Sequence, residues 1–256
     1  MRVAHRLHGP EGAPVLVLSN SLGTTQELWD RHLPVFARRF RVLTYDHPGH
    51  GSSGLPAQPC TVEVLARALL GLLDELGLGR VSICGVSIGA MVGMTLALKE
   101  PEHVERLVLA CTSAHLGPAE PWEERARIAR TEGLEAIADD VVGRWFTPEL
   151  AHDQPETVAR FRAMLTTTPP EGYARCCEAL AAWDARERIS TITAPTLVMA
   201  GAEDRAAPVE HTELVASRIP GARLHVLEGA AHLANVERAE EFTGAVLEHL
   251  GQGVAV

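Results

Sequence analysis

Short apolar runs along the chain alternate with longer segments in which apolar residues recur at helical spacing. The runs have six or seven residues each and lie at 14–19, 40–45, 80–85, 106–111, 195–201 and 223–229. They lack the strict alternation of a half-exposed strand, so we expect strands that are covered on both faces. Helical patterns occupy 62–76, 90–99 and 239–250, and the first of these follows a capping residue, Thr61. Together these patterns predict an α/β fold with a mostly parallel, doubly wound sheet.

The alternation stops between residues 115 and 190. This stretch reads as helices without convincing strands, and it holds six of the eleven aromatic residues. We therefore expect a core formed by residues 1–114 and 191–256, with residues 115–190 inserted between two strands as a helical cap, or lid. Ligands bind beside the carboxyl ends of the strands in such sheets, and a lid would cover that edge. Alternatively, the aromatic side chains only pack the insertion against the core.

Charge and composition narrow the function. A length of 256 residues suits one α/β domain with an inserted subdomain. The net charge of −10, without a basic stripe, argues against a nucleic-acid partner. No apolar run approaches the roughly 20 residues that span a bilayer, and the N-terminus lacks the apolar segment of a secretion signal. We therefore expect a cytoplasmic protein without membrane contact.

The five cysteines are scattered and odd in number, which favours neither a disulfide framework nor a zinc site. We expect no metal and no cofactor. The sequence leaves open whether the chain forms a homo-oligomer.

The stretch "GVSIG" places Ser87 between Gly85 and Gly89, at the junction of an apolar run and an apolar helix. This G-x-S-x-G pattern in that context is typical of a nucleophilic serine on a sharp turn. The following helix would direct its free N–H groups at the reacting centre. The alternative is a serine that only caps a buried helix.

A serine hydroxyl needs a base to become a nucleophile, and the base needs an acid to orient it. His232 lies in a turn of small residues after the run 223–229, whereas other histidines fall within strands, on helices or at predicted surfaces. Glu203 and Asp204 follow the run 195–201, and spacing does not choose between them. These residues all follow strands, so we expect them to meet Ser87 at one edge of the sheet.

Acyl transfer also needs N–H donors for the developing oxyanion. One donor commonly comes from the residue after the nucleophile, here Ile88, and the other from a loop after a central strand. The stretch "SNSLGTT" is such a loop, with Leu22 as the best candidate and Gly23 next. The alternative is an ordinary turn, which Asn, Ser and Gly also favour.

With these parts located, the chain resembles the α/β-hydrolase superfamily over nearly its full length, and within it the 3-oxoadipate enol-lactonases. The resemblance rests on "LSNSLGTTQELWD", "YDHPGHGSS", "GVSIGAMVG", "RWFTPEL", "RFRAMLTTTPPEGYARCCEA", "APTLVMAGAEDRAAP" and "LEGAAHLANVE". The segments "EGYARCCEA" and "SNSLGTT" are more specific than the serine turn. Ala90 and the pair His47-Pro48 depart from the common family pattern, which puts substrate detail in doubt more than the reaction class.

The resemblance implies Ser87 as nucleophile, His232 as base and Asp204 as the orienting acid. It implies Leu22 and Ile88 as oxyanion donors. The implied reaction is hydrolysis of 3-oxoadipate enol-lactone to 3-oxoadipate through an acyl-enzyme, a step of bacterial aromatic catabolism. The partner would then be a small anionic lactone. Asn20 and Ser21 stand where relatives usually carry His-Gly, and we expect them to contact this substrate.

An anionic substrate in an acidic protein requires a local cation. The lid offers Arg144, Arg160, Arg162 and Arg175. We favour Arg144 because it adjoins Trp145, and we expect Trp122 and Trp145 to line the lid side of the site. The alternative for Arg144 is a solvated surface arginine.

Three other functions stay open. A different serine esterase or C–C bond hydrolase would differ only in lid and pocket, and a haloperoxidase-type side activity would share the serine, histidine and acid. A non-catalytic ligand receptor could also retain these residues. A haloalkane dehalogenase is disfavoured because it needs an aspartate in place of Ser87.

Overall fold

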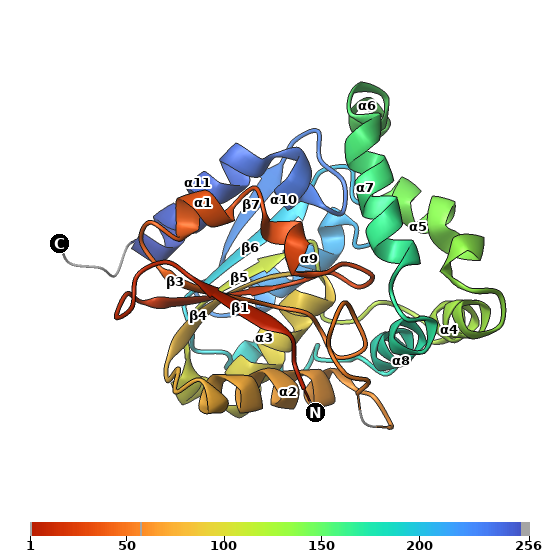
Figure 1. Cartoon of the computed structure of the whole chain (residues 1–256). Coiled ribbons are helices and arrows are strands. Elements are labelled where there is room, and N and C mark those ends of the chain that lie inside the picture. The colour runs from red at the N-terminus through yellow and green to blue at the C-terminus, as the bar shows by residue number, and fades with distance from the viewer. Residues whose placement is uncertain (1, 57, 252–256) are drawn as a thin grey trace.

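The structure is a computed structural model that describes residues 2–56 and 58–251. Across these residues seven strands form one sheet in the order β1-β3-β2-β4-β5-β6-β7 (Figure 1). Neighbouring strands are parallel except β1, which pairs antiparallel with β3. The strands are β1 His5–His8, β2 Val15–Ser19, β3 Arg41–Tyr45, β4 Val81–Val86, β5 Val104–Ala110, β6 Thr196–Gly201 and β7 Arg223–Leu227. The predicted fold class is confirmed.

Helices connect the strands and cover the sheet. Those of the core are α1 Leu33–Phe36, α2 Val62–Glu75, α3 Ile88–Lys99, α9 Val209–Arg218, α10 Ala234–Glu237 and α11 Ala239–Gly251. Short 3-10 helices lie at Gln26–Trp29, Pro101–His103, Leu134–Ile137 and Ile189–Thr191. Figure 1 shows α2 and α3 on one side of the sheet and α11 on the other. Within the described part of the chain no helix is both long and apolar enough to cross a membrane.

Burial on both faces explains why the strand sequences do not alternate. Every residue of β4 and β6 is buried, and α3 is buried from Ile88 to Ala97. A helix that is apolar all round belongs inside a protein. The central strands and α3 therefore form the rigid part of the core, and α3 begins directly after Ser87.

The six expected strands are present, with ends displaced by a few residues. β5 begins at Val104 rather than 106, and α3 begins at Ile88 rather than 90. β1 was not expected because "HRLH" offers a single apolar residue. It forms through pairing with β3, in which Leu7 lies opposite Leu43.

Between β5 and β6 the chain forms a set of helices that we call the helical insertion. Its members are α4 Glu120–Glu132, α5 Ala138–Trp145, α6 Pro148–Asp153, α7 Pro155–Thr166 and α8 Pro170–Ala181. These helices gather at one side of the molecule, beyond the core helices (Figure 1).

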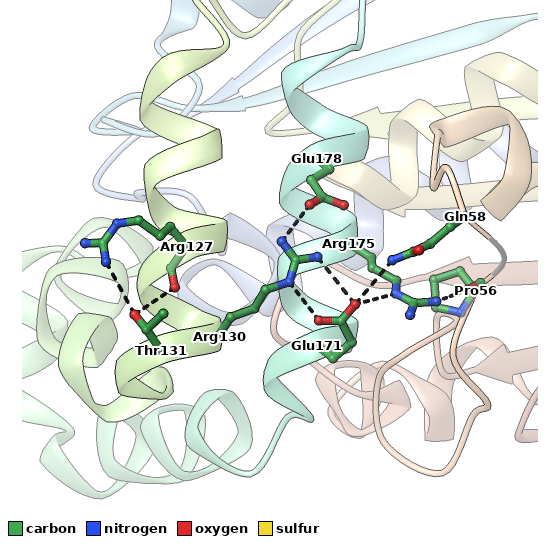
Figure 2. Close-up of polar contacts among 8 residues, drawn as sticks. All are labelled: Pro56, Gln58, Arg127, Arg130, Thr131, Glu171, Arg175 and Glu178. Carbon is green, nitrogen blue, oxygen red and sulfur yellow. Dashed lines mark hydrogen bonds and ion pairs between the residues drawn. The ribbon is translucent and has the colours of Figure 1, made fainter.

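Ion pairs join α4 to α8, and a hydrogen bond joins α8 to the core (Figure 2). Arg130 of α4 contacts Glu171 at 2.7 Å and Glu178 at 2.6 Å on α8. Arg175 of α8 contacts Glu171 at 2.7 Å and donates to the carbonyl of Pro56 at 2.6 Å. Such partly exposed pairs contribute little to stability individually. They fix the orientation of α8 against the loop after β3.

The insertion and the core also meet where two glycines face each other. A Cβ on Gly172 of α8 would lie 2.0 Å from the carbonyl oxygen of Gly49, in the loop after β3. Only hydrogen atoms fit at this contact, so α8 can approach the core loop closely.

Two Gly→Ala substitutions in helices should have opposite effects, because Gly172 lies at this contact and Gly71 lies in open space. Gly172→Ala should lower the free energy of unfolding by roughly 1–3 kcal/mol, because overpacking outweighs the gain in helix propensity. Gly71→Ala in α2, where a Cβ meets nothing within 4 Å, should raise it by up to about 1 kcal/mol. Denaturant titrations of both variants measure the two effects. Equal stabilisation by both would contradict the close contact.

Candidate active site

Ser87 occupies a strained backbone position between β4 and α3. Its φ of 58° and ψ of −121° lie in a region that L-residues rarely adopt. The Ser87 N–H donates to the Ala110 carbonyl at 2.9 Å, and the Thr112 hydroxyl donates to the Ser87 carbonyl at 3.0 Å. Although Ser87 precedes α3, its side chain makes no capping hydrogen bond to that helix. The alternative role as an N-cap is therefore not supported.

The two glycines of the motif are required by close packing around this turn. A Cβ on Gly85 would lie 2.4 Å from the carbonyl carbon of Gly89. A Cβ on Gly89 would lie 2.3 Å from the carbonyl oxygen of Ser19, at the end of β2. Both positions are thus restricted to glycine because the strand, the helix and the neighbouring strand approach so closely.

Sheet topology brings the serine turn beside the 20–23 loop. β2 and β4 are neighbours, and the chain leaves β2 toward β3 on one side and β4 toward β5 on the other. The loops after such a pair diverge and leave a crevice at the carboxyl ends of the strands. Ser87 follows β4, Asp204 follows β6 and His232 follows β7. The sequence-predicted residues therefore meet at one edge of the sheet.

Asp204, rather than Glu203, contacts the histidine. The distance between Asp204 Oδ2 and His232 Nδ1 is 2.8 Å, and both side chains are buried. Asp204 Oδ1 accepts hydrogen bonds from the N–H groups of Ala206 at 2.8 Å and Ala207 at 2.9 Å. A carboxylate that is held in this way accepts the Nδ1 proton of the imidazole, and in the neutral ring this tautomer leaves Nε2 as a proton acceptor. Glu203 is exposed.

One pocket joins these residues to the helical insertion. Ser21, Leu22, Ser87 and His232 line it from the core. Trp122, Arg125, Arg144, Trp145 and Tyr173 line it from the insertion. Ser87 and His232 share this pocket, and the structure has no direct hydrogen bond between these two described residues. Catalytic hydrogen bonds often close only when substrate binds.

The structure distinguishes the two candidate oxyanion donors of the 20–23 loop. The N–H of Gly23 already donates to His50 Nε2 at 3.0 Å. Within the described residues, the N–H of Leu22 has no such partner, and that of Ile88 heads α3. Leu22 thus lines the pocket with an unused donor, and Ile88 follows the pocket residue Ser87 directly.

Two buried histidines hold this loop in place. His47 Nε2 donates to the Asn20 carbonyl at 2.9 Å, while His50 Nε2 accepts from Gly23. Burial lowers the pKa of His47 to about 4 and that of His50 to about 3. Both rings are therefore neutral, and the hydrogen bond that His50 Nε2 accepts requires this. The "HPGH" segment, which departs from the family pattern at His47-Pro48, has a supporting function for the loop.

Asn20 does not contact the pocket. Its Nδ2 donates to the Tyr45 carbonyl at 2.7 Å, and its Oδ1 accepts from Trp29 Nε1 at 2.9 Å. The side chain is fully buried, and both of its polar ends are engaged within the core. The structure thus gives the Asn20 side chain partners in the core instead of a place in the pocket, whereas Ser21 does line the pocket.

Three of the candidate lid arginines are engaged elsewhere. Arg160 pairs with Asp30, Arg162 with Glu135 and Asp139, and Arg175 with Glu171. Arg144 lines the pocket, but it also pairs with Asp140 at 2.9 Å on the surface of α5.

Sequence reasoning missed Arg125, which lines the pocket from α4. Its guanidinium carbon lies 4.8 Å from the centroid of the Trp122 ring, and no carboxylate in the described residues forms an ion pair with it. The signal was the spacing of Trp122 and Arg125, since residues three apart share one face of a helix. Arg125 is therefore a cation available to an anionic ligand.

Ligand atoms of Glu100, Glu102 and His103 lie within 4.8 Å of one another and could share a metal ion. They lie just beyond the C-terminal end of α3, whereas Ser87 precedes its N-terminal end. The pocket chemistry does not involve this cluster.

Comparison with known proteins agrees with the fold. Residues 7–245 match the model of the alpha/beta hydrolase family. The chain is 38% identical to 3-oxoadipate enol-lactonase 2 of Acinetobacter baylyi, over 93% of this chain and 89% of that protein. It is 31% identical to a candidate carbamate hydrolase, RutD, of Stutzerimonas stutzeri, over 97% of this chain and 96% of that protein. The crystal structure of the enol-lactonase from Burkholderia xenovorans superposes with a TM-score of 0.95 at 40% identity. The match covers 98% of this chain and 96% of that chain.

The buried histidines predict how stability depends on pH. In the unfolded chain His50 titrates near 6.5, but in the folded protein its pKa is about 3. Below pH 6.5 the unfolded state therefore binds a proton that the folded state does not, and stability falls as pH decreases toward 3. The expected slope is about 1.4 kcal/mol per pH unit for this histidine.

His50→Gln should reduce the slope of unfolding free energy against pH by about that amount between pH 6 and 4. The measurement is a series of denaturant titrations across this range. His152→Gln, at an exposed position on α6, is the matched control and should leave the slope unchanged. An unaltered slope in His50→Gln would show that His50 is not neutral in the folded protein.

Proposed function

The chain belongs to the alpha/beta hydrolase family and is a lactone or ester hydrolase, and we propose that it opens 3-oxoadipate enol-lactone to 3-oxoadipate through a Ser87–His232–Asp204 triad. The observation that carries this proposal is that Ser87 and His232 line the same pocket. Ser87 has a strained backbone and a side chain that does not cap α3, and His232 is hydrogen-bonded to Asp204. The names of two relatives, both enol-lactonases, supply the substrate class. The reaction would serve bacterial catabolism of aromatic compounds.

In the first step Ser87 Oγ attacks the lactone carbonyl carbon, and His232 Nε2 takes the hydroxyl proton. Asp204 stabilises the imidazolium that forms, because it already accepts the Nδ1 proton at 2.8 Å. The Ser87 hydroxyl would form its hydrogen bond to Nε2 when the substrate fills the pocket, since catalytic hydrogen bonds often close only in that complex.

The tetrahedral intermediate needs donors for its oxyanion, and we assign the N–H groups of Leu22 and Ile88. Each is worth on the order of 3 kcal/mol of barrier in comparable enzymes. The N-terminus of α3 adds a favourable dipole at the same place. His47 and His50 support the reaction by holding the loop that carries Leu22.

Collapse of the intermediate breaks the ring C–O bond and leaves an ester on Ser87. The leaving oxygen is an enolate, which takes the proton from His232 and tautomerises to the ketone. Water then attacks the acyl-enzyme carbonyl while His232 accepts a proton from it, and Ser87 leaves with that proton. In the overall reaction, one lactone and one water give one molecule of 3-oxoadipate.

The substrate carboxylate requires a cation, and we propose Arg125 for this contact. Arg125 lines the pocket and forms no ion pair with any residue of 2–56 or 58–251, whereas Arg144 is partly neutralised by Asp140. Trp122 and Trp145 would enclose the ring, and residues 115–190 would serve as the lid. Because the insertion supplies these side chains, it would determine which ester enters.

Other esters, carbamates or C–C bonds could be cleaved by the same triad, and a receptor would bind without turnover. Steady-state assays against the enol-lactone, neutral aryl esters and a carbamate distinguish these functions. The proposal requires the highest kcat/KM for the enol-lactone. Saturable binding without any turnover would instead identify a receptor.

Ser87→Ala should abolish lactone opening while the protein keeps its fold, because no other residue supplies the nucleophile. A coupled assay with enzymatically generated enol-lactone measures the loss, and the thermal unfolding midpoint checks the fold. Wild-type turnover in this variant would refute the nucleophile.

Asp204→Asn should lower kcat by roughly 10³- to 10⁴-fold, because an amide favours the wrong tautomer of His232. Glu203→Gln is the matched control, since it makes the equivalent change at the adjacent exposed position. It should retain activity within about twofold. A larger loss in Glu203→Gln than in Asp204→Asn would reassign the acid.

Arg125→Gln should raise KM for the anionic lactone by roughly tenfold or more and leave KM for a neutral aryl ester nearly unchanged. Arg144→Gln tests the other pocket arginine and should have a smaller effect. If Arg144→Gln proves the more damaging for the lactone, Arg144 is the carboxylate ligand.

A further inference from the structure

Glu237 is a half-buried carboxylate that no step of the mechanism uses. It ends α10, the short helix that begins two residues after His232. Its Oε1 accepts hydrogen bonds from both the N–H and the hydroxyl of Thr147, each at 2.8 Å. Its Oε2 accepts a short hydrogen bond from the N–H of Ala231. Three donors thus converge on one side chain.

These donors come from two different parts of the molecule. Ala231 immediately precedes His232, so one carboxylate oxygen holds the loop that carries the histidine. Thr147 belongs to the insertion, where its hydroxyl accepts from the N–H of Leu150 and caps α6. The other carboxylate oxygen therefore holds the insertion.

A second contact reinforces this connection. The N–H of Leu233 donates to the carbonyl of Trp145 at 2.9 Å. Ala231 and Leu233 stand on either side of His232, and Trp145 lines the pocket two residues before Thr147. The histidine loop and the pocket wall are consequently joined on both sides of the base.

We propose that Glu237 is a positioning residue that fixes His232 and the Trp145 wall of the pocket relative to each other. The inference rests on the proposed role of His232 as base, but not on the identity of the ester. Through Glu237, the position of the insertion determines how well His232 is aligned with Ser87.

The chemistry of the contacts explains why a carboxylate is needed here. Two oxygens accept from three donors, whereas a carboxamide offers only one acceptor oxygen. Burial raises the pKa of Glu237, and the hydrogen bonds from Ala231 and Thr147 act in the opposite direction, favouring the charged form. Glu237→Gln therefore leaves at least one donor unpaired at either the histidine loop or the insertion.

The test uses the full chain and two probes that do not depend on the lactone. One is the rate at which a fluorophosphonate modifies Ser87, and the other is kcat and KM for a neutral aryl ester. Glu237→Gln should slow fluorophosphonate modification and lower kcat by roughly tenfold, because small misplacements of a base are costly. Thr147→Val should mainly raise KM through the Trp145 wall, and Thr147→Ser should restore wild-type values.

Matched controls separate positioning from loss of fold. Glu240→Gln makes the same chemical change at an exposed position on α11 and should match wild type in both probes. The double variant Glu237→Gln, Thr147→Val should lose less than the product of the single effects, because the two residues share one contact. Thermal unfolding midpoints identify any variant that fails to fold, in which case the Thr147 pair alone decides.

Wild-type kcat and modification rate in Glu237→Gln would overturn the inference. Two further outcomes would give Glu237 only a structural role and would also overturn the inference. One is a loss in the double variant that equals the product of the single losses. The other is a loss of activity that follows the unfolding midpoint, with no separate effects of the Glu237 and Thr147 variants on kcat and KM. Failure of the enol-lactone as a substrate, with normal fluorophosphonate modification in wild type, would refute the proposed function and leave this inference standing.

Discussion

The backbone of Ser87 at the junction of β4 and α3 is the constraint on which the site depends. A positive φ at a non-glycine residue is unfavourable by itself, so the surrounding structure must impose it. The apolar burial of β4 and α3 does so, and Gly85 and Gly89 remove the Cβ atoms that would keep these elements apart. Because the hydroxyl does not cap the helix, it is available for chemistry.

Sheet topology arranges the remaining parts of the site around that turn. Buried side chains, either neutral histidines or a hydrogen-bonded histidine and carboxylate, then hold the loops in place. The loop after β2 is held by His47 and His50, and His232 is held by Asp204. The insertion contacts both sides of this arrangement. Gly172 packs on the core loop that contains the histidine pair, and Thr147 bonds to the loop that carries His232 through Glu237. The pocket wall and the loops that carry Leu22 and His232 therefore form one connected unit.

The sequence predicted much of this because the relevant signals are local. Buried parallel strands give apolar runs, and the serine, the acid and the histidine each follow a strand end, in that order along the chain. Other features depend on contacts between distant residues. The side chain of Asn20 is engaged by Trp29 and Tyr45, Arg125 points into a pocket formed by separate helices, and β1 forms only through pairing with β3. No local pattern distinguishes Asp204 from Glu203, whereas burial and a hydrogen bond do.

The most direct test of the account is a crystal structure of the protein after reaction with a fluorophosphonate. We predict a phosphorus–oxygen bond at Ser87 Oγ, with a phosphonyl oxygen accepting hydrogen bonds from the N–H groups of Leu22 and Ile88 and with His232 Nε2 beside Oγ. An adduct on a different residue, or a phosphonyl oxygen directed away from both amides, would contradict it.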